Sequence, residues 1–89
     1  MTAVTTTTIT VRYFAAARAA AGVEVEKIQV ASAATVADLL DAVRAAHGPE
    51  LARVLARCSY LLDEVAVRDH GAPVAGATSL DVLPPFAGG

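Results

Sequence analysis

The carboxyl end of the chain, residues 84–89 (PPFAGG), carries the chemistry that the sequence makes most prominent. The two prolines favour a stiff, extended exit from the preceding strand. Phe86 offers an apolar anchor, and Gly88 has no Cβ, so it fits a narrow channel. Six residues extend at most about 20 Å, enough to reach a buried pocket on another protein. The only reactive group that such a tail delivers is the α-carboxylate of Gly89.

A carboxylate is a poor electrophile until it is activated. Adenylation by an ATP-using partner would form a mixed anhydride, and a sulfur nucleophile would then convert it into a thiocarboxylate. In this scheme the chemistry lies in the partner enzymes, and the chain supplies the group that they modify.

The other residues with chemical potential do not form a recognisable site. His47 and His70 stand 23 positions apart without a cysteine or paired carboxylate at ligand spacing, so the sequence predicts no metal site. His47 is expected to be a surface cap at a helix end. Cys58 continues an apolar helical stripe and is predicted to be a small buried hydrophobe. The acidic residues are predicted to lie apart on solvated surfaces: Asp38, Asp41, Asp63 and Glu64.

Length, composition and charge limit the classes of protein to which the chain can belong. The 89 residues fit one domain, and 55% of them are hydrophobic, which favours a globular fold. A net charge of −2 with one lysine leaves no basic face for nucleic acid. A single cysteine cannot form an internal disulfide. Because the sequence shows neither a signal peptide nor an apolar stretch long enough to span a membrane, we expect a cytoplasmic protein.

Alternating patterns predict two strands at the start of the chain. Residues 8–14 alternate with Ile9, Val11 and Tyr13 on one side. An alanine-rich, helix-favouring connection over residues 15–21 leads to a second strand over residues 24–30, so the two strands are expected to pair as an antiparallel hairpin. In the second strand a one-residue slip suggests a bulge. Its inward residues are then expected to be Val23, Val25, Ile28 and Val30.

The clearest helix signal begins at Thr35, an N-cap with Asp38 three positions on. Its apolar stripe consists of Val36, Leu39, Leu40 and Val43. His47 and Gly48 close this helix, and Pro49 opens a second, short one. The apolar positions of the short helix are Leu51, Val54, Leu55 and Cys58. Short strands are predicted over residues 59–62, 65–67 and 80–83.

The main helix cannot bury its stripe alone and needs a sheet to lie across. We therefore expect an α+β domain with a mixed, largely antiparallel sheet of about four to five strands. One main helix packs on that sheet, beside a second short helix. Residues 1–6 are expected to be a flexible leader, residues 7–85 the domain, and residues 86–89 an extended tail.

From about Thr8 to Gly89 the chain resembles the MoaD-type small subunit of molybdopterin synthase, a sulfur carrier of the ubiquitin-like β-grasp superfamily. The resemblance lies in VRYFA (11–15), Arg18, AAG (20–22), ATVADLL (34–40) and LPPFAGG (83–89). The middle departs from the family. Asp63 and Glu64 replace a frequent Asn-Gly turn, and residues 77–79 stand near the usual Gly-Asp turn.

The resemblance implies a β-grasp fold and a cycle of reactions. A MoeB-type adenylyltransferase uses ATP to adenylate Gly89, and a sulfur donor protein completes the thiocarboxylate. The tail then enters the MoaE-type large subunit, with Gly88 in the channel, and donates sulfur to cyclic pyranopterin monophosphate. Pro85, Phe86 and Ala87, with an exposed apolar patch of the sheet, would contact that partner in a heterotetramer. By this resemblance the chain is expected to bind no cofactor and to be non-catalytic alone, acting as the sulfur-carrying subunit of a sulfurtransferase complex, with ATP used by the partner adenylyltransferase.

Other functions fit the same tail. The chain can be a sulfur carrier for the thiazole of thiamine or for cysteine assembly. It can also be a ubiquitin-like modifier joined to lysines through an isopeptide bond, or a β-grasp binding module with an inert tail.

Overall fold

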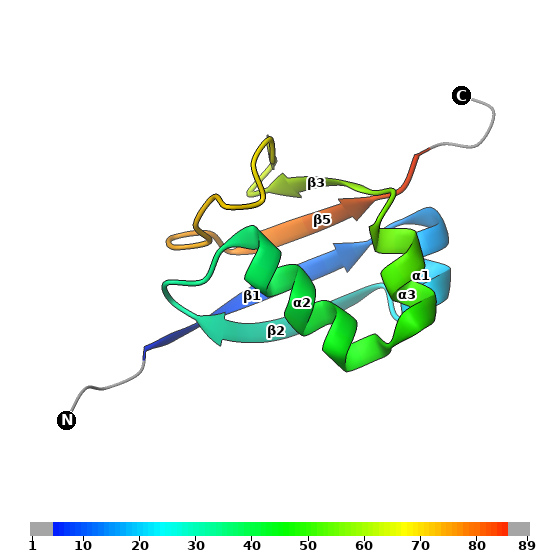
Figure 1. Ribbon diagram of the computed structural model, residues 1–89, viewed down its shortest axis with the longest axis horizontal. Coiled ribbons are helices and arrows are strands. Elements are labelled where there is room, and N and C mark those ends of the chain that lie inside the picture. The colour runs from blue at the N-terminus through cyan, green and yellow to red at the C-terminus, as the bar shows by residue number, and fades with distance from the viewer. Residues whose placement is uncertain (1–4, 86–89) are drawn as a thin grey trace.

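The structure, a computed structural model, describes residues 5–85. This part of the chain forms one five-stranded sheet with the strand order β2-β1-β5-β3-β4. Figure 1 shows α2 crossing one face of the sheet, with α1 and α3 gathered at one end. The elements, in chain order, are β1 (Thr6–Tyr13), α1 (Ala15–Ala21), β2 (Val25–Ala31), α2 (Val36–His47), α3 (Pro49–Leu55), β3 (Ser59–Leu62), β4 (Val65–Ala66) and β5 (Ser79–Leu83).

The sheet is mixed, as the sequence predicts. β1 pairs with β2 in antiparallel fashion and with β5 in parallel fashion, and β3 pairs antiparallel with both β5 and β4. β5 is the last strand in the sequence, yet it occupies the centre of the sheet. The α+β architecture, the β1–β2 hairpin and the pair of helices α2 and α3 are confirmed.

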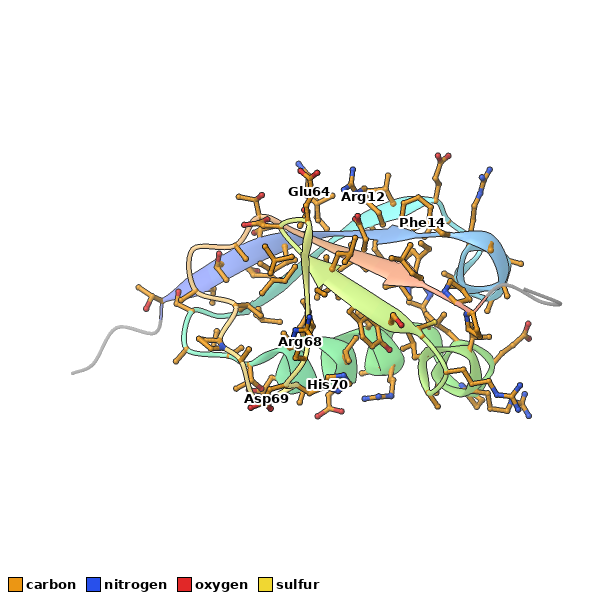
Figure 2. All side chains as sticks on the ribbon, turned by 90° about the horizontal axis from the view of Figure 1, so that it is seen from above. Arg12, Phe14, Glu64, Arg68, Asp69 and His70 are labelled. Carbon is orange, nitrogen blue, oxygen red and sulfur yellow. The ribbon has the colours of Figure 1, made fainter. Side chains whose placement is uncertain are left out.

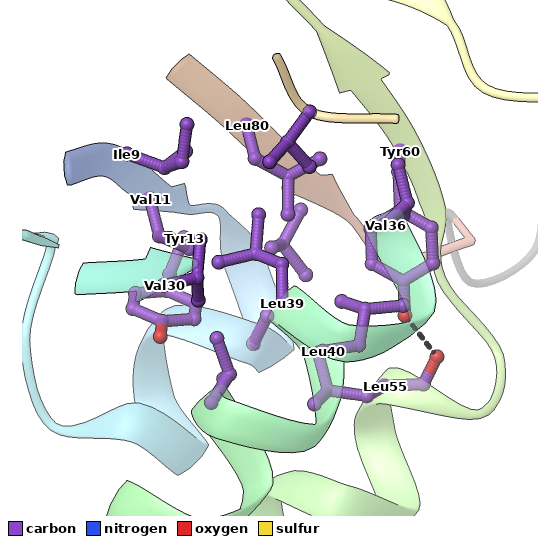
Figure 3. Packing of buried hydrophobic residues seen from close by; sticks show 14 of the residues in the cluster. Ile9, Val11, Tyr13, Val30, Val36, Leu39, Leu40, Leu55, Tyr60 and Leu80 are labelled. Carbon is purple, nitrogen blue, oxygen red and sulfur yellow. Dashed lines mark hydrogen bonds between the residues drawn. The ribbon is translucent and has the colours of Figure 1, made fainter. Parts of the chain in front are cut away.

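The core lies between the sheet and α2. Alternation along β1 turns Ile9, Val11 and Tyr13 toward the helices, and each is at most 1% exposed. The predicted stripe of α2 is buried in full. Figure 3 shows these side chains packed against one another and against Tyr60, whose hydroxyl donates to the carbonyl oxygen of Leu55 at 2.6 Å. Burial of this stripe is the main reason that α2 is stable in the fold.

The ends of α2 also follow the sequence. The Thr35 hydroxyl accepts a hydrogen bond from the Asp38 backbone N–H at 3.2 Å, and the Asp38 carboxylate accepts one from the Thr35 N–H at 3.0 Å. This reciprocal capping satisfies two N–H groups that have no partner within the helix. At the other end Gly48 has φ 99°, which favours glycine, and Pro49 then starts α3.

In the second strand the predicted inward facing of Ile28 and Val30 is confirmed, whereas the predicted bulge and the inward facing of Val23 and Val25 are wrong. The β1–β2 ladder runs without a bulge from Thr6↔Ala31 to Arg12↔Val25. Val25 therefore points outward and is 50% exposed, while Val23 precedes the strand and is 41% exposed. The inward positions belong to Glu26, Ile28 and Val30. Glu26 is accommodated there because its carboxylate accepts hydrogen bonds from neighbours on β1 and α2.

One boundary and the structure of one connection also differ from the expectation. β1 begins at Thr6, so the strand takes in the last residue assigned to the leader. The alanine-rich connection forms the helix α1, which ends at Gly22 in the left-handed conformation (φ 77°). The hydrogen bond from Gly22 N–H to the Arg18 carbonyl closes this helix at 2.9 Å.

The β3–β4 turn adopts the geometry of an Asn-Gly turn without having that sequence. Asp63 and Glu64 both have positive φ, 48° and 68°, as a tight two-residue hairpin turn of type I′ requires. Asp63 Oδ1 accepts hydrogen bonds from the backbone N–H groups of Thr78 and Ser79, both at 2.9 Å. These bonds lower the pKa of Asp63. The two places where the sequence departs from the family are therefore in contact.

Candidate functional site

The carboxyl end of the domain leaves from the centre of the sheet. β5 is held by β1 on one side and by β3 on the other, and it ends at Leu83. Pro84 is buried and Pro85 is exposed. Since proline has no N–H to donate, the ladder stops there. The predicted site residues Phe86, Ala87, Gly88 and Gly89 lie outside the described residues.

The sheet face opposite the helices carries several partly or fully exposed apolar residues close to the end of β5. We call them the outer patch: Phe14, Val25, Leu61 and Leu83. Phe14 is 41% exposed, and its backbone N–H donates to the Val82 carbonyl at 3.3 Å, so it lies beside the last residues of β5. Figure 2 shows Phe14 with Arg12 and Glu64 on the side away from α2 and α3. An apolar surface of this kind, next to the chain end, suits contact with another protein.

Arg12 and Asp81 form an ion pair at the middle of the same face. Arg12 Nε lies 2.6 Å from Asp81 Oδ1, and Arg12 Nη2 lies 3.0 Å from Asp81 Oδ2. Asp81 is only 7% exposed, whereas the Arg12 side chain is 45% exposed. The hydrogen bonds to Asp81 raise the pKa of Arg12. A two-point pair of this kind holds the guanidinium in a fixed orientation on a surface that is otherwise open.

A hollow of about 300 Å³ opens beside this pair. Its lining comes from the ends of β1 and β2 and from the segment that joins α1 to β2. The lining residues are Arg12, Tyr13, Phe14, Glu24 and Val25. It is shallow and open, so it suits a side chain from a partner better than an enclosed small molecule.

A second polar cluster lies on the helix side of the sheet. The Tyr13 hydroxyl donates to the Glu26 carboxylate, and His47 Nε2 contacts the same oxygen. Burial and then the Glu26 carboxylate raise the pKa of Tyr13. The prediction of a surface His47 is wrong, because its side chain is 15% exposed and lies edge-on to Tyr13 with ring centroids 5.8 Å apart. The cluster joins α2 to β1 and β2.

The remaining candidates have structural positions. Burial raises the pKa of the Cys58 thiol, which is half-buried and lies 3.2 Å from the Val54 carbonyl oxygen, so it favours the unreactive neutral form. Asp38 caps α2, and Asp41 pairs with Arg44 at 2.8 Å. His70 is exposed and lies edge-on to Tyr60.

Neither a metal centre nor a membrane span is found in residues 5–85. No group of three His, Cys, Asp or Glu side chains in this range is placed to hold a metal ion. Within the same range no helix combines the length and the hydropathy needed to cross a bilayer.

The sequence did not predict the Arg12–Asp81 pair or the Glu26–His47 contact. The sequence did contain one signal. Arg12 stands between the buried residues Val11 and Tyr13 of β1, so its side chain had to point to the opposite face of the sheet. Its partner is 69 positions away in the sequence. Only the parallel register of β1 and β5 brings the two together.

A mixed sheet with a parallel central pair and a helix packed across it is the ubiquitin-like β-grasp fold. The model of the ThiS family matches residues 11–89. The chain belongs to this family of MoaD/ThiS-type proteins. Its function is that of a sulfur carrier or of a ubiquitin-like modifier.

Solved structures agree with this fold. The chain is similar to SAMP1 from Haloferax volcanii, with 30% identity and a TM-score of 0.81 over 93% of this chain and 100% of that one. It is similar in fold to a putative molybdopterin converting factor, subunit 1, from Pyrococcus furiosus (23% identity, TM-score 0.78, 89% and 98% covered). It is also similar in fold to a chain in the complex of subunits 1 and 2 of the molybdopterin-converting factor from Helicobacter pylori (19% identity, TM-score 0.68, 93% and 100% covered). No curated protein sequence gives a significant match.

Proposed function

We propose that this chain is the sulfur-carrying small subunit of a molybdopterin synthase. In the proposed cycle a MoeB-type enzyme uses ATP to adenylate the Gly89 carboxylate, and pyrophosphate leaves. Sulfide released by a sulfur donor then attacks the acyl carbon of the adenylate, AMP leaves, and the sulfur remains on Gly89 as a thiocarboxylate. A MoaE-type subunit uses two such sulfur atoms, one from each of two thiocarboxylated chains, to build the dithiolene on cyclic pyranopterin monophosphate, and each Gly89 returns to a carboxylate as water replaces the sulfur. The single observation that carries the proposal is the family match, which extends to the terminal Gly88 and Gly89.

The position of β5 supports this role. Two neighbouring strands fix the point from which the chain leaves the domain, so binding of the body also positions the start of the tail. From Pro84 the remaining residues extend at most about 20 Å, which allows the carboxylate to react inside a partner while the body stays outside. A long reach from a fixed base suits a carrier that visits more than one enzyme.

The outer patch supports a docking role for the face beside the tail. Phe14 and Leu83 lie next to the chain exit, and Arg12 adds a charged group held in place by Asp81. We propose that both the adenylating enzyme and the large subunit cover this face. The helix side is less suited to docking because its apolar residues are already buried against the sheet.

Intact-protein mass spectrometry tests the proposal. The full chain is incubated with ATP, a MoeB-type enzyme and a sulfur source. The expected product is heavier by the difference between one sulfur and one oxygen atom. Deletion of Gly89 should abolish this gain and leave the fold intact, while deletion of Thr2 at the other terminus is the matched control. Sulfuration of the pterin by the chain without Gly89 would contradict the proposal.

A bulky residue at Gly88 tests passage through the partner's channel. Gly88→Leu should block sulfur transfer because a side chain at this position clashes in a channel that accepts glycine. The circular dichroism spectrum should not change. A Gly88→Leu chain that transfers sulfur at the normal rate would show that no narrow channel is used.

A second candidate is a ubiquitin-like protein modifier. The similarity to SAMP1, a small archaeal modifier protein, favours it. In that reaction a lysine amine attacks the Gly89 adenylate, an isopeptide bond forms and AMP leaves. Recovery of branched Gly89–lysine peptides from cells would support this candidate. Transfer of sulfur to a thiazole or cysteine precursor, with none to the pterin, would identify a carrier for another pathway.

A further inference from the structure

The two edges of the sheet differ greatly in length. Among the described residues, β2 has a neighbour only on its β1 side, and it is seven residues long. The other edge strand, β4, has two residues. Figure 1 shows β2 along the border of the sheet, with α2 crossing the face beside it. β2 therefore presents the long free edge of the molecule.

The hydrogen-bond pattern shows which backbone groups of β2 face outward. Tyr13 N–H donates to the Glu24 carbonyl at 2.9 Å, and Ser32 N–H donates to the Thr5 carbonyl at 3.0 Å. In an antiparallel ladder the bonded residues alternate, so the even-numbered residues of β2 bond to β1. The residues whose N–H and C=O groups point away from the sheet are Val25, Lys27, Gln29 and Ala31.

This edge carries only part of the protection that edge strands usually have, namely Lys27 and the inward-pointing Glu26. The seven residues contain no proline or glycine, and their register with β1 is continuous. Lys27 is the only basic residue among them. A long, flat edge of this kind is a template for pairing with another strand.

We propose that a second copy of this chain pairs with β2 in antiparallel fashion, about a two-fold axis at Ile28. In this register Gln29 lies opposite Lys27 of the second copy, and Val30 lies opposite Glu26 of the second copy. The two half-buried Ile28 side chains meet on the helix side of the sheet. All outward groups of β2 bond, and no like charges lie directly opposite each other.

Neighbouring registers are less favourable. An axis at Lys27 places the two ammonium groups opposite each other, and an axis at Glu26 does the same with the two carboxylates. Like charges directly opposite destabilise a strand pair. An axis at Gln29 opposes no like charges, but it places Val25 opposite Ala33, which lies beyond the end of β2. The axis at Ile28 is therefore the one that pairs all seven residues of β2 without opposing like charges.

There is room for the second strand at the end of β2. A hollow of about 370 Å³ lies between this end and the start of α2. In the proposed register, Val25 and Glu26 of the second copy approach it. Its lining residues are Val30, Ala31, Ala33, Ala34 and Asp38.

The dimer goes beyond the proposed function and does not depend on it. β5 is separated from the paired edge by β1, so both carboxyl ends stay accessible. A seven-residue seam is about 24 Å long, and an interface of this size belongs to the weak, reversible class of less than about 1,200 Å². We therefore expect a concentration-dependent dimer.

The test is sedimentation together with amide hydrogen exchange on the full chain, from about 10 μM to about 1 mM, the range expected for a small interface. The chain should move from monomer to dimer, and the amides of Val25, Lys27, Gln29 and Ala31 should become protected. Gln29→Pro should abolish both effects while the fold is kept, because the lost N–H does not bond to β1. Gln29→Ala is the matched control, since both variants lose the side-chain bond to Thr6 but only one loses the N–H.

Three results would overturn the proposal. The first is a chain that stays monomeric over the whole range. The second is a dimer that Gln29→Pro leaves intact. The third is concentration-dependent protection at β3 or β5 without protection of β2, which would place the contact on another surface.

Discussion

Two neighbours on β1, Arg12 and Tyr13, show how the two faces of the sheet differ. Tyr13 points to the helix side, where it is 1% exposed and donates to Glu26. Arg12 points to the other side, where it pairs with Asp81 and keeps a side chain that is 45% exposed. Each residue is part of a polar contact with a carboxylate. The contact of Tyr13 with Glu26 is covered by α2, whereas the contact of Arg12 with Asp81 is open to solvent.

The comparison separates stability from recognition. On the helix side, polar groups join elements that are already packed, so changes there should act on folding. On the outer side, the charged pair and the outer patch have no element above them within the described residues, so changes there should act on partners. Because successive side chains of a strand point to opposite faces of the sheet, adjacent residues on β1 can serve these two roles, stability and recognition.

The largest effect on stability is expected from Leu40→Ala. Leu40 is 1% exposed in the stripe of α2, and its truncation leaves a cavity that costs about 2–5 kcal/mol. Urea denaturation measures the loss, and Ala45→Ser on the exposed side of α2 is the control. A change of less than about 0.5 kcal/mol, typical of surface sites, would show that the helix is not packed as described.

A smaller effect is expected from Glu26→Ala, which removes the acceptor for the buried Tyr13 hydroxyl. Leaving that donor without a partner costs about 1–3 kcal/mol. The exposed Glu24→Ala is a matched control, because it removes the same charge two residues away. Urea denaturation at neutral pH should separate the two variants, and equal stability would argue against the cluster.

The stability difference between the native chain and Glu26→Ala should also depend on pH. The folded state raises the pKa of Tyr13 above its ordinary value of 10.0, so the stabilisation is complete below pH 10.0 and is lost as the pH rises beyond it. Without Glu26 two of the three causes of the raised pKa disappear and only burial remains, so the pKa of Tyr13 in folded Glu26→Ala is less raised. Both chains should lose stability in parallel as the pH rises above 10.0, and the stability gap between them should narrow only above the folded-state pKa of Tyr13 in Glu26→Ala.

The smallest effect on stability is expected from Phe14→Ser on the outer patch. Phe14 is 41% exposed and occupies the N-cap position of α1, where serine is favoured, so stability should change by less than about 0.5 kcal/mol. Sulfur loading by an adenylating enzyme should nevertheless slow, since an apolar contact is lost. Normal loading kinetics would remove the outer patch from the docking surface.

The sequence predicted the parts of the fold that local pattern determines. The alternation of Ile9, Val11 and Tyr13 identified β1 and its buried side, and the spacing from Val36 to Val43 identified α2 with its caps. In both segments the apolar residues have the period of the element, so pattern and packing agree. The tail residues 86–89 lie outside the described residues, and their predicted roles stay predictions.

The sequence failed where a polar residue faced the helix side of the sheet. Val23 and Val25 are more apolar than Glu26, so composition favoured the wrong side of β2. The ladder with β1 decided the facing instead, and contacts with Tyr13 and His47 made the half-buried carboxylate acceptable. Such a cluster joins three elements, and no local window contains all of its members.

The central place of β5 has a consequence for how the protein is made. β1 and β3 both pair with β5, the last of the described strands to be synthesised, so the sheet cannot close before Leu83 has left the ribosome. A product that stops before β5 lacks the middle of its sheet. The order of synthesis thereby keeps an incomplete domain from reaching the folded state.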